Sequence, residues 1–458
     1  MALLDHDDEL TPHALAMVVD SINSNPAADL FYSDEDKISV DGTRFNPYFK
    51  SDWNPELLLS HNFVCHLGVY RREIVNRIGG FRKDFVGAQD WDLLLRFVEQ
   101  IPESNIVHIP MILYHWRTVP ESTASSSAAK PYALVNAIRA MREHLERTGI
   151  NGEVTEVPEF SMLRVRYELP QPSPLVSIII PTRDRRDLLE RCIESILSKS
   201  SYRNFEILVI DNGSSDPATL EYLNTGEKEK RFQVLRDNRP FNFSRLNNSA
   251  AAQAKGSILG FLNNDLELIT PDWLEEMLSY FSREGVGAVG ARLWYPNDTL
   301  QHGGITVGIG GVAGHAHKCF AKGDPGYFNR AALPGCFSGV TAACMLVRRQ
   351  VFEKIKGFDE ENLTIAFNDV DLSLRICEAG SRIVWTPYAE FYHYESASRG
   401  YETTPEKTAR FEKEIVYMMQ RWGDRLTNDP YYNPNLTLLT EDYGLGFPPR
   451  VRKPWARS

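Results

Sequence analysis

Three short polar clusters between residues 182 and 265 contain residues that could bind a nucleotide and a metal ion. Thr182 and Asp184 follow the apolar run VSIIIP, Asp211 follows ILVI, and Asn263 and Asp265 follow ILGFL. Acids after the first two runs suit the hydrogen-bond donors of a base and a ribose. An acid after the third suits a hard cation such as Mg²⁺ or Mn²⁺, which takes oxygen ligands and keeps contacts with substrate phosphates. The structural alternative is that these are strand-ending turn acids.

The elements that must position these clusters follow from the apolar pattern. Residues 174–197, 205–216 and 256–265 indicate buried strands that end in polar turns, with an amphipathic helix after the first strand. This order is typical of a parallel sheet of βαβ units. Ligands of such sheets bind beyond the carboxyl ends of the strands, where all three clusters fall. No GxGxxG follows any of these three strands and no GxxxxGK[ST] is present, so neither a dinucleotide fold nor a P-loop is predicted.

The start of a later helix offers a general base. FNDVDLSLRICEAG predicts a helix that begins near Asn368 and stops at Gly380, with Asp369 in its first turn. The helix dipole stabilises a charged acid there, as a base at neutral pH requires. Asp371 lies about 200° further round the helix, so the two acids cannot face the same acceptor. We predict Asp369 as the base; the alternative is an acid that only stabilises the helix start.

The chain also repeats part of itself. Four segments of the first third match four later segments in the same order: 4–15 with 262–274, 69–81 with 346–358, 89–96 with 368–375, and 106–117 with 383–396. The first copy has no counterpart of residues 174–262. Its counterparts of the metal and base residues are Asp5, Asp7, Asp90 and His115. We therefore expect the first copy to keep the metal and acceptor half of a site without the strands that bind a nucleotide.

This repeat predicts the domain organisation. We expect an incomplete module at residues 1–150, a linker strand at 151–171, a complete module at 172–400, and a helical extension with a basic tail at 401–458. Residues 120–131 are small and polar and predict a flexible loop. Truncation of a longer two-enzyme protein is the favoured explanation of the short first copy. A natural half-module kept for packing or acceptor binding is the alternative.

Composition excludes several classes of protein. The 458 residues carry a net charge of −11, which argues against a nucleic-acid binder. No apolar run approaches the ~20 residues of a membrane helix, and the first 20 residues do not resemble a signal peptide. Six scattered cysteines favour reduced thiols. We expect a cytoplasmic protein. The basic stretch at 450–457 is interpreted as a solvated tail, with a weak peripheral contact to anionic lipid at the inner membrane face as the alternative.

The ordered segments VSIIIPTRDR, VIDNGSSD, LNND, NDVDLSLR and HYESASRG resemble the motifs of family-two glycosyltransferases of the GT-A fold. The likeness is greatest to bacterial two-module enzymes of O-antigen and surface-polysaccharide synthesis, including rhamnosyltransferase-like members, and it covers essentially the whole chain. It implies an α/β, GT-A (nucleotide-diphospho-sugar transferase) fold in two modules, the first lacking its N-terminal nucleotide-binding half.

The resemblance also implies the roles of the site residues. Thr182, Asp184 and Asp211 would line the nucleoside site, Asp265 would bind a divalent metal, Mg²⁺ or Mn²⁺, and His393 would be a ligand of the metal or the diphosphate. The family's Asp-x-Asp signature here begins with the uncharged Asn263. Neutral or basic donors therefore remain an alternative to the metal, and a structural histidine remains an alternative for His393.

The implied reaction is an inverting transfer from a nucleotide-sugar donor, dTDP- or UDP-linked, to a glycan or lipid-linked glycan acceptor. Asp369 would take the proton of the acceptor hydroxyl. A diphosphate leaving group needs no acid, so one base suffices, in contrast to glycosidases.

Two rival functions and one histidine cluster stay open. A nucleotidyltransferase would need a Gly-rich phosphate loop after the first strand, and PTRDRRD has no glycine. A non-catalytic scaffold that binds glycan or partner enzymes is the rival from another class. In GHAH, His315 and His317 would share one face of a strand and suggest zinc, but without a third ligand nearby we favour a loop over the acceptor cleft. His302 has no assigned role.

Overall fold

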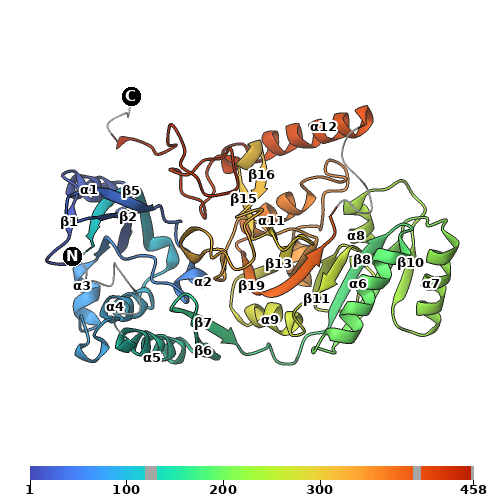
Figure 1. The fold of residues 1–458 in the computed structure, drawn as a ribbon, viewed down its shortest axis with the longest axis horizontal. Helices are drawn as coiled ribbons and strands as arrows, with labels where there is room; N and C mark the ends of the chain where they lie inside the picture. Colours follow the sequence, from blue (N-terminus) through green and yellow to red (C-terminus); the bar gives the residue numbers. More distant parts are fainter. Residues whose placement is uncertain (119–130, 396–403, 455–458) are drawn as a thin grey trace. The chain divides into compact units, whose positions relative to one another are not determined.

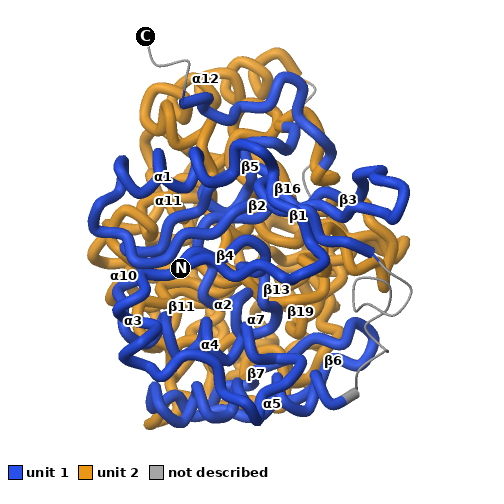
Figure 2. Tube along the Cα trace, turned by 90° about the vertical axis from the view of Figure 1, so that its left-hand side faces the viewer, with its two compact units in different colours: residues 1–168, 430–437, 444–458 blue, residues 169–429, 438–443 orange. Residues whose placement is uncertain are grey.

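The computed structural model describes residues 1–118, 131–395 and 404–454. Almost all of the loop predicted at 120–131, the end of the HYESASRG motif from residue 396, and the last residues of the basic tail lie outside this part of the chain. The chain divides into two compact units (Figure 2): unit 1 comprises residues 1–168, 430–437 and 444–458, and unit 2 comprises 169–429 and 438–443. Within the described ranges, no helix is both long and apolar enough to span a bilayer.

Unit 2 is an α/β unit built on one large sheet (Figure 1). Across the sheet the strands are β10 (Gln233–Arg236), β9 (Phe205–Asp211), β8 (Val176–Thr182), β11 (Ile258–Leu262), β18 (Cys344–Arg348), β13 (Val286–Trp294), β19 (Arg382–His393) and β12 (Leu266–Leu268). The first four run parallel, and β18 is antiparallel to both of its neighbours. At the margins, β14 (Leu300–His302) pairs with β13, and β17 (Gly335–Cys336) with β19.

The order of the parallel strands creates a switch point in the sheet. From β8 the chain passes through α6 (Arg186–Lys199) to β9 and through α7 (Pro217–Lys228) to β10. It then returns through α8 (Phe243–Ala251) to β11, on the other side of β8. Because such crossovers are right-handed, α6 and α7 cover one face and α8 the opposite face (Figure 1). Ligands of parallel sheets bind where the direction reverses, which here is between the carboxyl ends of β8 and β11.

The remaining elements of unit 2 complete its core. They are α9 (Trp273–Ser279), the paired strands β15 (Ile305–Val307) and β16 (Ala313–His315), α10 (Arg349–Lys354), α11 (Asn368–Glu378) and α12 (Pro405–Trp422). Met418 and Trp422 of α12 pack against Val370 and Leu374 of α11. The helix predicted as a C-terminal extension is therefore part of the core of unit 2.

Unit 1 contains a five-stranded sheet in the order β1 (Glu9–Leu10), β5 (Ile106–Arg117), β2 (Leu30–Ile38) and β3 (Arg44–Tyr48), with β4 (Gly68–Tyr70) also on β2. Its helices are α1 (Ala14–Ser24), α2 (Pro55–Leu58), α3 (Arg72–Arg77), α4 (Gln89–Val98) and α5 (Pro131–Thr148). The path β1, β5, β2, β4 has the same pairing directions as β12, β19, β13, β18 of unit 2. The described residues of unit 1 contain no set of strands like β8 to β10.

Residues 151–171, for which the sequence predicts one strand and a linker, contain a hairpin. Strand β6 (Gly152–Val157) pairs antiparallel with β7 (Met162–Tyr167), and both belong to unit 1. The turn between them follows Pro158 and holds Ser161 at a φ of 51°. Alternating apolar residues run through both strands, so the pattern alone does not separate one long strand from two short ones.

Candidate active site

The ends of three parallel strands are tied together at the switch point. Thr182, the last residue of β8, lies opposite Asp211, the last residue of β9. Its hydroxyl accepts a hydrogen bond from Nδ2 of Asn264, which follows β11, at 3.0 Å. All three residues are buried. The structure therefore brings together two of the predicted nucleotide-site residues with the LNND segment of the predicted metal site.

Asp184 shapes a loop in this structure. Its Oδ1 accepts hydrogen bonds from the backbone N–H groups of Ser215 at 2.7 Å and Asp216 at 2.8 Å. Its own N–H donates to Oγ of Ser214 at 2.8 Å. These bonds hold the turn after β8 against the turn after β9, so Asp184 forms the wall of the predicted nucleoside site. Whether it also contacts a nucleoside stays a prediction.

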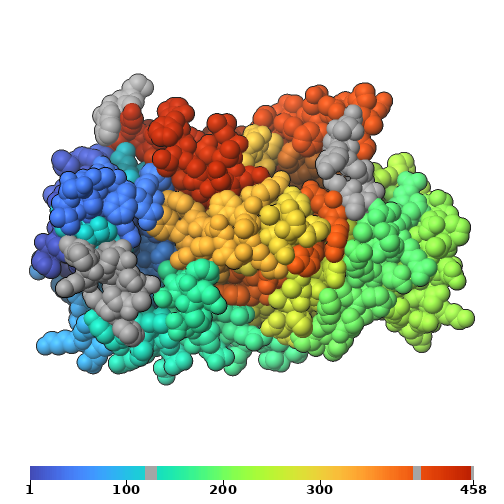
Figure 3. All heavy atoms as spheres, in the orientation of Figure 1, coloured from blue at the N-terminus to red at the C-terminus, as the bar shows by residue number. Residues whose placement is uncertain are grey.

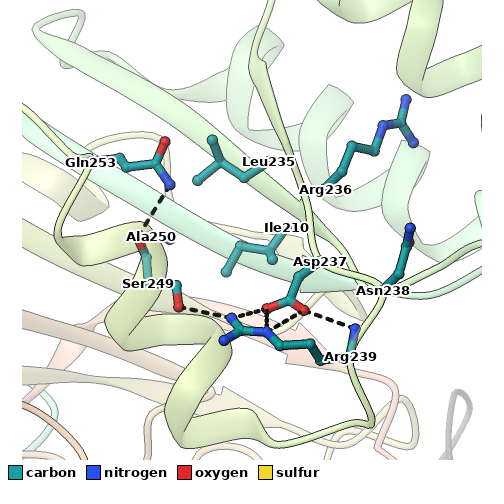
Figure 4. Close-up of a pocket in the computed structure, with 9 residues that line it drawn as sticks. All are labelled: Ile210, Leu235, Arg236, Asp237, Asn238, Arg239, Ser249, Ala250 and Gln253. Atoms are coloured by element: carbon teal, nitrogen blue, oxygen red, sulfur yellow. Dashed lines mark hydrogen bonds and ion pairs between the residues drawn. The ribbon is translucent and has the colours of Figure 1, made fainter.

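Asp211 pairs with a residue that lines a cavity, and the sequence did not predict this cavity. Its carboxylate accepts the N–H of Ser214 at 2.9 Å and pairs with the guanidinium of Arg236, the last residue of β10. Arg236 lines a cavity of about 380 Å³ whose apolar lining includes Ile210 and Leu235 (Figure 4). In the same cavity the guanidinium of Arg239 lies between the carboxylate of Asp237 and the hydroxyl of Ser249. The only sequence signal was the cluster RDNR after the short strand at 233–236.

Asp265 and His393 are brought together by strand pairing. Leu266 of β12 pairs with His393 of β19, and the N–H of Tyr394 donates to the carbonyl of Asp265 at 2.9 Å. Both side chains are buried, and Oδ1 of Asp265 lies 3.1 Å from Nε2 of His393. Among the residues that the structure describes, this buried oxygen makes no directed hydrogen bond.

Gln301 determines which nitrogen of His393 carries the proton. The Nε2 amide of Gln301 donates to the carboxylate of Glu395 at 2.8 Å, so its Oε1 faces the histidine. The Nδ1–H of His393 donates to this oxygen at 2.6 Å. In the neutral ring, Nε2 of His393 therefore presents a lone pair toward Asp265 and toward Nδ2 of Asn263, 3.2 Å away. This is the tautomer of a metal-ligating histidine. In the sequence, Gln301 carried no signal.

These two groups fit a divalent cation as partial ligands. An unsatisfied buried carboxylate oxygen and an imidazole lone pair 3.1 Å apart could both contact one ion. In the described part of the chain, no three His, Cys, Asp or Glu residues gather as a metal site. Water and substrate phosphates would supply the other ligands, as is usual for Mg²⁺ and Mn²⁺.

Asp369 and Asp371 have different environments, as their helical spacing predicts. Asp371 is fully buried and accepts from Nε of Arg375 at 2.7 Å and from the indole N–H of Trp422 at 3.1 Å. Asp369, in the first turn of α11, is only half-buried. Its Oδ2 accepts the N–H of Ala342 at 3.1 Å. Asp371 is thus committed to packing, and Asp369 is the acid of the pair that remains partly accessible.

The first-copy residues do not form a matching site. The pairing of β4 with β2, of β2 with β5 and of β5 with β1 aligns Leu10 and Tyr114 of unit 1 with Leu268 and Phe391 of unit 2. Asp7 therefore occupies the position of Asp265, as the repeat predicts, whereas His115 occupies that of Tyr392, one residue before the position of His393. Asp5 is exposed.

In unit 1, the side chains of Asp8 and His115 both have structural partners. The carboxylate of Asp8 accepts the N–H of Arg117 at 2.7 Å and the hydroxyl of Tyr114. Nδ1 of His115 bonds the carboxylate of Asp36. Asp90, at the start of α4, accepts a hydrogen bond from Nδ2 of Asn62 at 3.1 Å. Asp5, Asp7, Asp90 and His115 therefore do not converge on a common point through any of these contacts.

Comparison with known proteins gives matches over the whole chain. Residues 177–356 match the family model of glycosyl transferase family 2. An uncharacterized protein of Sinorhizobium fredii, y4gI, is 49% identical over 98% of this chain and 49% of its own length. The O-antigen biosynthesis protein RfbC of Myxococcus xanthus is 40% identical over 97% of this chain and 34% of its own length. The chain thus spans about half and about a third of these relatives.

Similar solved structures are more distant in sequence. GalNAc-T7 with UDP, GalNAc and Mn²⁺ is 16% identical, with a TM-score of 0.44 over 55% of this chain and 50% of that one. A mannosyltransferase of Pyrobaculum calidifontis in complex with GDP-Man and Mn²⁺ is 17% identical, with a TM-score of 0.40 over 64% of this chain and 75% of that one.

Proposed function

We propose that this chain, whose residues 177–356 match the family model of glycosyl transferase family 2, is a glycosyltransferase of GT-A fold that transfers a sugar from a nucleoside diphosphate to a growing cell-surface glycan. The observation that carries the proposal is the unsatisfied Oδ1 of Asp265 beside the lone pair of His393, at the switch point of the sheet. A buried carboxylate oxygen without a directed hydrogen bond is costly to a fold and is therefore a candidate for a group that a ligand completes.

The donor would extend along the ends of the parallel strands. The nucleoside would lie toward Asp211 and the cavity that Arg236 and Arg239 line. The diphosphate would lie toward Asp265 and His393. The apolar lining and the adjacent polar groups of this cavity suit a flat base with hydrogen-bonding edges. We place a dTDP- or UDP-sugar here.

A bound divalent cation would offset the negative charge that develops on the leaving diphosphate. Asp265 and His393 would hold that ion, and Gln301 would keep the imidazole in the ligating tautomer. The carboxylate of Asp369 would take the proton from one acceptor hydroxyl as its oxygen bonds to the anomeric carbon. The bond from that carbon to the diphosphate breaks in the same step, which inverts the configuration. The N–H of Ala342 holds one oxygen of Asp369 in place.

The acceptor proposal is supported by the name of one relative. RfbC of Myxococcus xanthus is described as an O-antigen biosynthesis protein. We propose an O-antigen-like glycan, free or lipid-linked, as the acceptor class, and rhamnosyl or hexosyl transfer as the reaction. Because this chain spans a third of that relative, the proposal concerns the site in unit 2.

A thermal-shift screen with product detection tests the function. The full chain is melted with UDP-, dTDP- and GDP-sugars, with and without MnCl₂, and release of nucleoside diphosphate is measured in parallel. We expect one donor class to raise Tm, more strongly with Mn²⁺, because a ligand that binds only the folded state stabilises it. Asp265→Asn should lose the Mn²⁺-dependent part of the shift. No shift and no release with any donor would refute the proposal and favour a scaffold.

A further inference from the structure

Two buried histidines contact each other near the proposed base. His302 ends β14 and His315 ends β16, and their Nδ1 atoms lie 2.8 Å apart. His302 is completely buried, whereas His315 is half-buried. Much of the segment from 300 to 335, gold to orange in Figure 3, lies at the surface of unit 2 on the face shown there. The pair therefore connects the core of unit 2 to a segment that reaches solvent.

A backbone N–H fixes the protons of both rings. The N–H of Thr341 donates to Nε2 of His302 at 3.3 Å, so this nitrogen carries a lone pair. The proton of neutral His302 is then on Nδ1 and is donated to Nδ1 of His315. His315 must in turn carry its own proton on Nε2. Burial lowers the pKa of His315 to about 4 and that of His302 well below its ordinary value, so both rings are neutral near pH 7.

The Nε2–H of His315 has no partner in the described part of the chain, although its orientation is fixed. Besides burial, the titratable groups that act on His315 are Lys318 of its own segment, Asp369 of α11, and His393 and Glu395 at the end of β19. Its backbone N–H is bound separately, by the carboxylate of Glu441 at 2.7 Å. A neutral donor is suited to a hydroxyl near Asp369, because it would not compete for the carboxylate as an imidazolium would.

The neighbouring contacts place the pair beside the proposed chemistry. Gln301, which precedes His302, sets the tautomer of His393, and Ala342, which follows Thr341, donates to Asp369. His317, two residues after His315, is completely buried: its Nε2 accepts the N–H of Tyr327 at 3.0 Å, and its ring stacks on Tyr443. Its Nδ1 also has no hydrogen-bond partner among the described residues, but this atom is enclosed by the protein, whereas the ring of His315 is only half-buried. A packing role accounts for His317, and of the two rings only that of His315 reaches solvent.

We propose that His315 is an acceptor-binding residue, which donates from Nε2–H to a hydroxyl of the acceptor sugar beside Asp369, and that His302 is the positioning residue that sets its tautomer. The inference rests on the proposed function and deepens it. It predicts a role in binding the acceptor and none in binding the donor.

Kinetics with two substrates test this role. Octyl glycosides of glucose, galactose, mannose, rhamnose and N-acetylglucosamine serve as acceptors, and hydrolysis of the nucleotide sugar by water serves as the reaction without an acceptor. For His315→Ala we expect an acceptor KM raised about tenfold, the effect of losing one hydrogen bond. Donor KM and hydrolysis should stay within about twofold. His315→Gln should recover part of the loss, because its amide N–H extends to a similar distance.

His317→Gln is the matched control, since it changes a histidine of the same segment that packs in the core. It should lower Tm without raising the acceptor KM of the folded protein. Equal acceptor KM values for wild type and His315→Ala would overturn the inference while leaving the proposed function intact. A wild-type protein that releases no nucleoside diphosphate with any donor and acceptor would overturn the proposed function and this inference with it.

The tautomers are tested independently by NMR on protein labelled with ¹⁵N-histidine. In the wild type we expect His302 to carry its proton on Nδ1 and His315 on Nε2. In His302→Phe the His315 signals should shift toward a mixture of tautomers, because the donor to its Nδ1 is gone. A wild-type His315 with its proton on Nδ1 would contradict the proposal, even if the kinetic variants are less active.

Discussion

Unit 1 and unit 2 each place acids and a histidine at the ends of equivalent strand pairs, β1 with β5 and β12 with β19, yet they surround them differently. In unit 1, Asp8 is held by a backbone N–H and a tyrosine hydroxyl, and His115 is held by Asp36. In unit 2, Oδ1 of Asp265 has no directed hydrogen bond within the described chain, and His393 turns a lone pair toward it. The same backbone arrangement thus carries a closed structural network in one unit and an open pair of ligands in the other.

A second feature is the same in both units. In unit 1, Arg96 pairs with Asp92 four residues before it and donates to the carbonyls of Ile78 and Gly80. In unit 2, Arg375 pairs with Asp371 and donates to the carbonyls of Ile355 and Gly357. This clamp joins a helix to the turn before it in each unit. The two units therefore share their scaffold, and the Asp265 oxygen that lacks a directed hydrogen bond among the described residues, beside the lone pair of His393, distinguishes unit 2.

The largest expected effect concerns the shared clamp. Asp371→Ala leaves Arg375 without its buried carboxylate, and breaking such a pair costs about 3–5 kcal/mol of the free energy of unfolding. Asp92→Ala should cost a similar amount in unit 1, where Arg82 also loses one of its two carboxylate partners and keeps Glu143. Denaturant unfolding with hydrogen exchange would measure both and show which unit opens. Asp369→Ala is the control and should change stability by less than about 1 kcal/mol. Equal losses for Asp369→Ala and Asp371→Ala would contradict the distinction between them.

The next effect concerns the proposed base. Asp369→Asn should lower the rate of sugar transfer by on the order of 10³, because removing a general base typically costs 10²–10⁴. Donor binding, measured by thermal shift, should be unchanged. The equivalent Asp90→Asn in unit 1 should leave transfer unaffected. Full activity of Asp369→Asn would refute its assignment, and loss of activity in Asp90→Asn would show that unit 1 contributes to the chemistry.

A smaller loss of transfer activity is expected when the proposed metal ligands Asp265 and His393 are disturbed. Asp265→Asn should reduce transfer by on the order of 10², because an amide holds a divalent cation more weakly than a carboxylate. Asp7→Asn changes the equivalent residue of unit 1 and should leave transfer within about twofold, because the charged partner of Asp7 is His6 of the same unit. Both are measured as nucleoside diphosphate release at saturating Mn²⁺. Similar losses in the two variants would remove the proposed difference between the units.

The smallest expected effect concerns Gln301, the hydrogen-bond partner that orients His393. Gln301→Leu removes the acceptor of the His393 Nδ1–H and should weaken the affinity for Mn²⁺ about tenfold, as loss of such outer partners usually does. The Mn²⁺ concentration for half-maximal activity measures this affinity. Asp36→Asn changes the partner of His115 in unit 1 and should not alter that concentration. An unchanged Mn²⁺ requirement in Gln301→Leu would show that His393 is not a metal ligand.

Much of unit 2 could be predicted from local patterns. The buried apolar runs before Thr182, Asp211 and Asn263 indicated parallel strands, because such strands are covered on both faces. Helical spacing separated Asp369 from Asp371 before any contact was known. The internal repeat predicted which segments of unit 1 and unit 2 would have matching strands. These features depend on neighbours within a few residues or on direct similarity between segments.

Gln301, His302 and His115 show what the pattern left open. The partners of Gln301 and His302 are 92 and 13 residues away in sequence, so no local period relates them. Only strand register, which backbone hydrogen bonds set, showed that His115 lies one residue before the position of His393. The sequence by itself determined the order of strands, the acids at their ends and the face of the base. The tertiary structure alone decided which acids are satisfied and which imidazole nitrogens carry lone pairs, because both depend on hydrogen-bond partners that folding brings from distant segments.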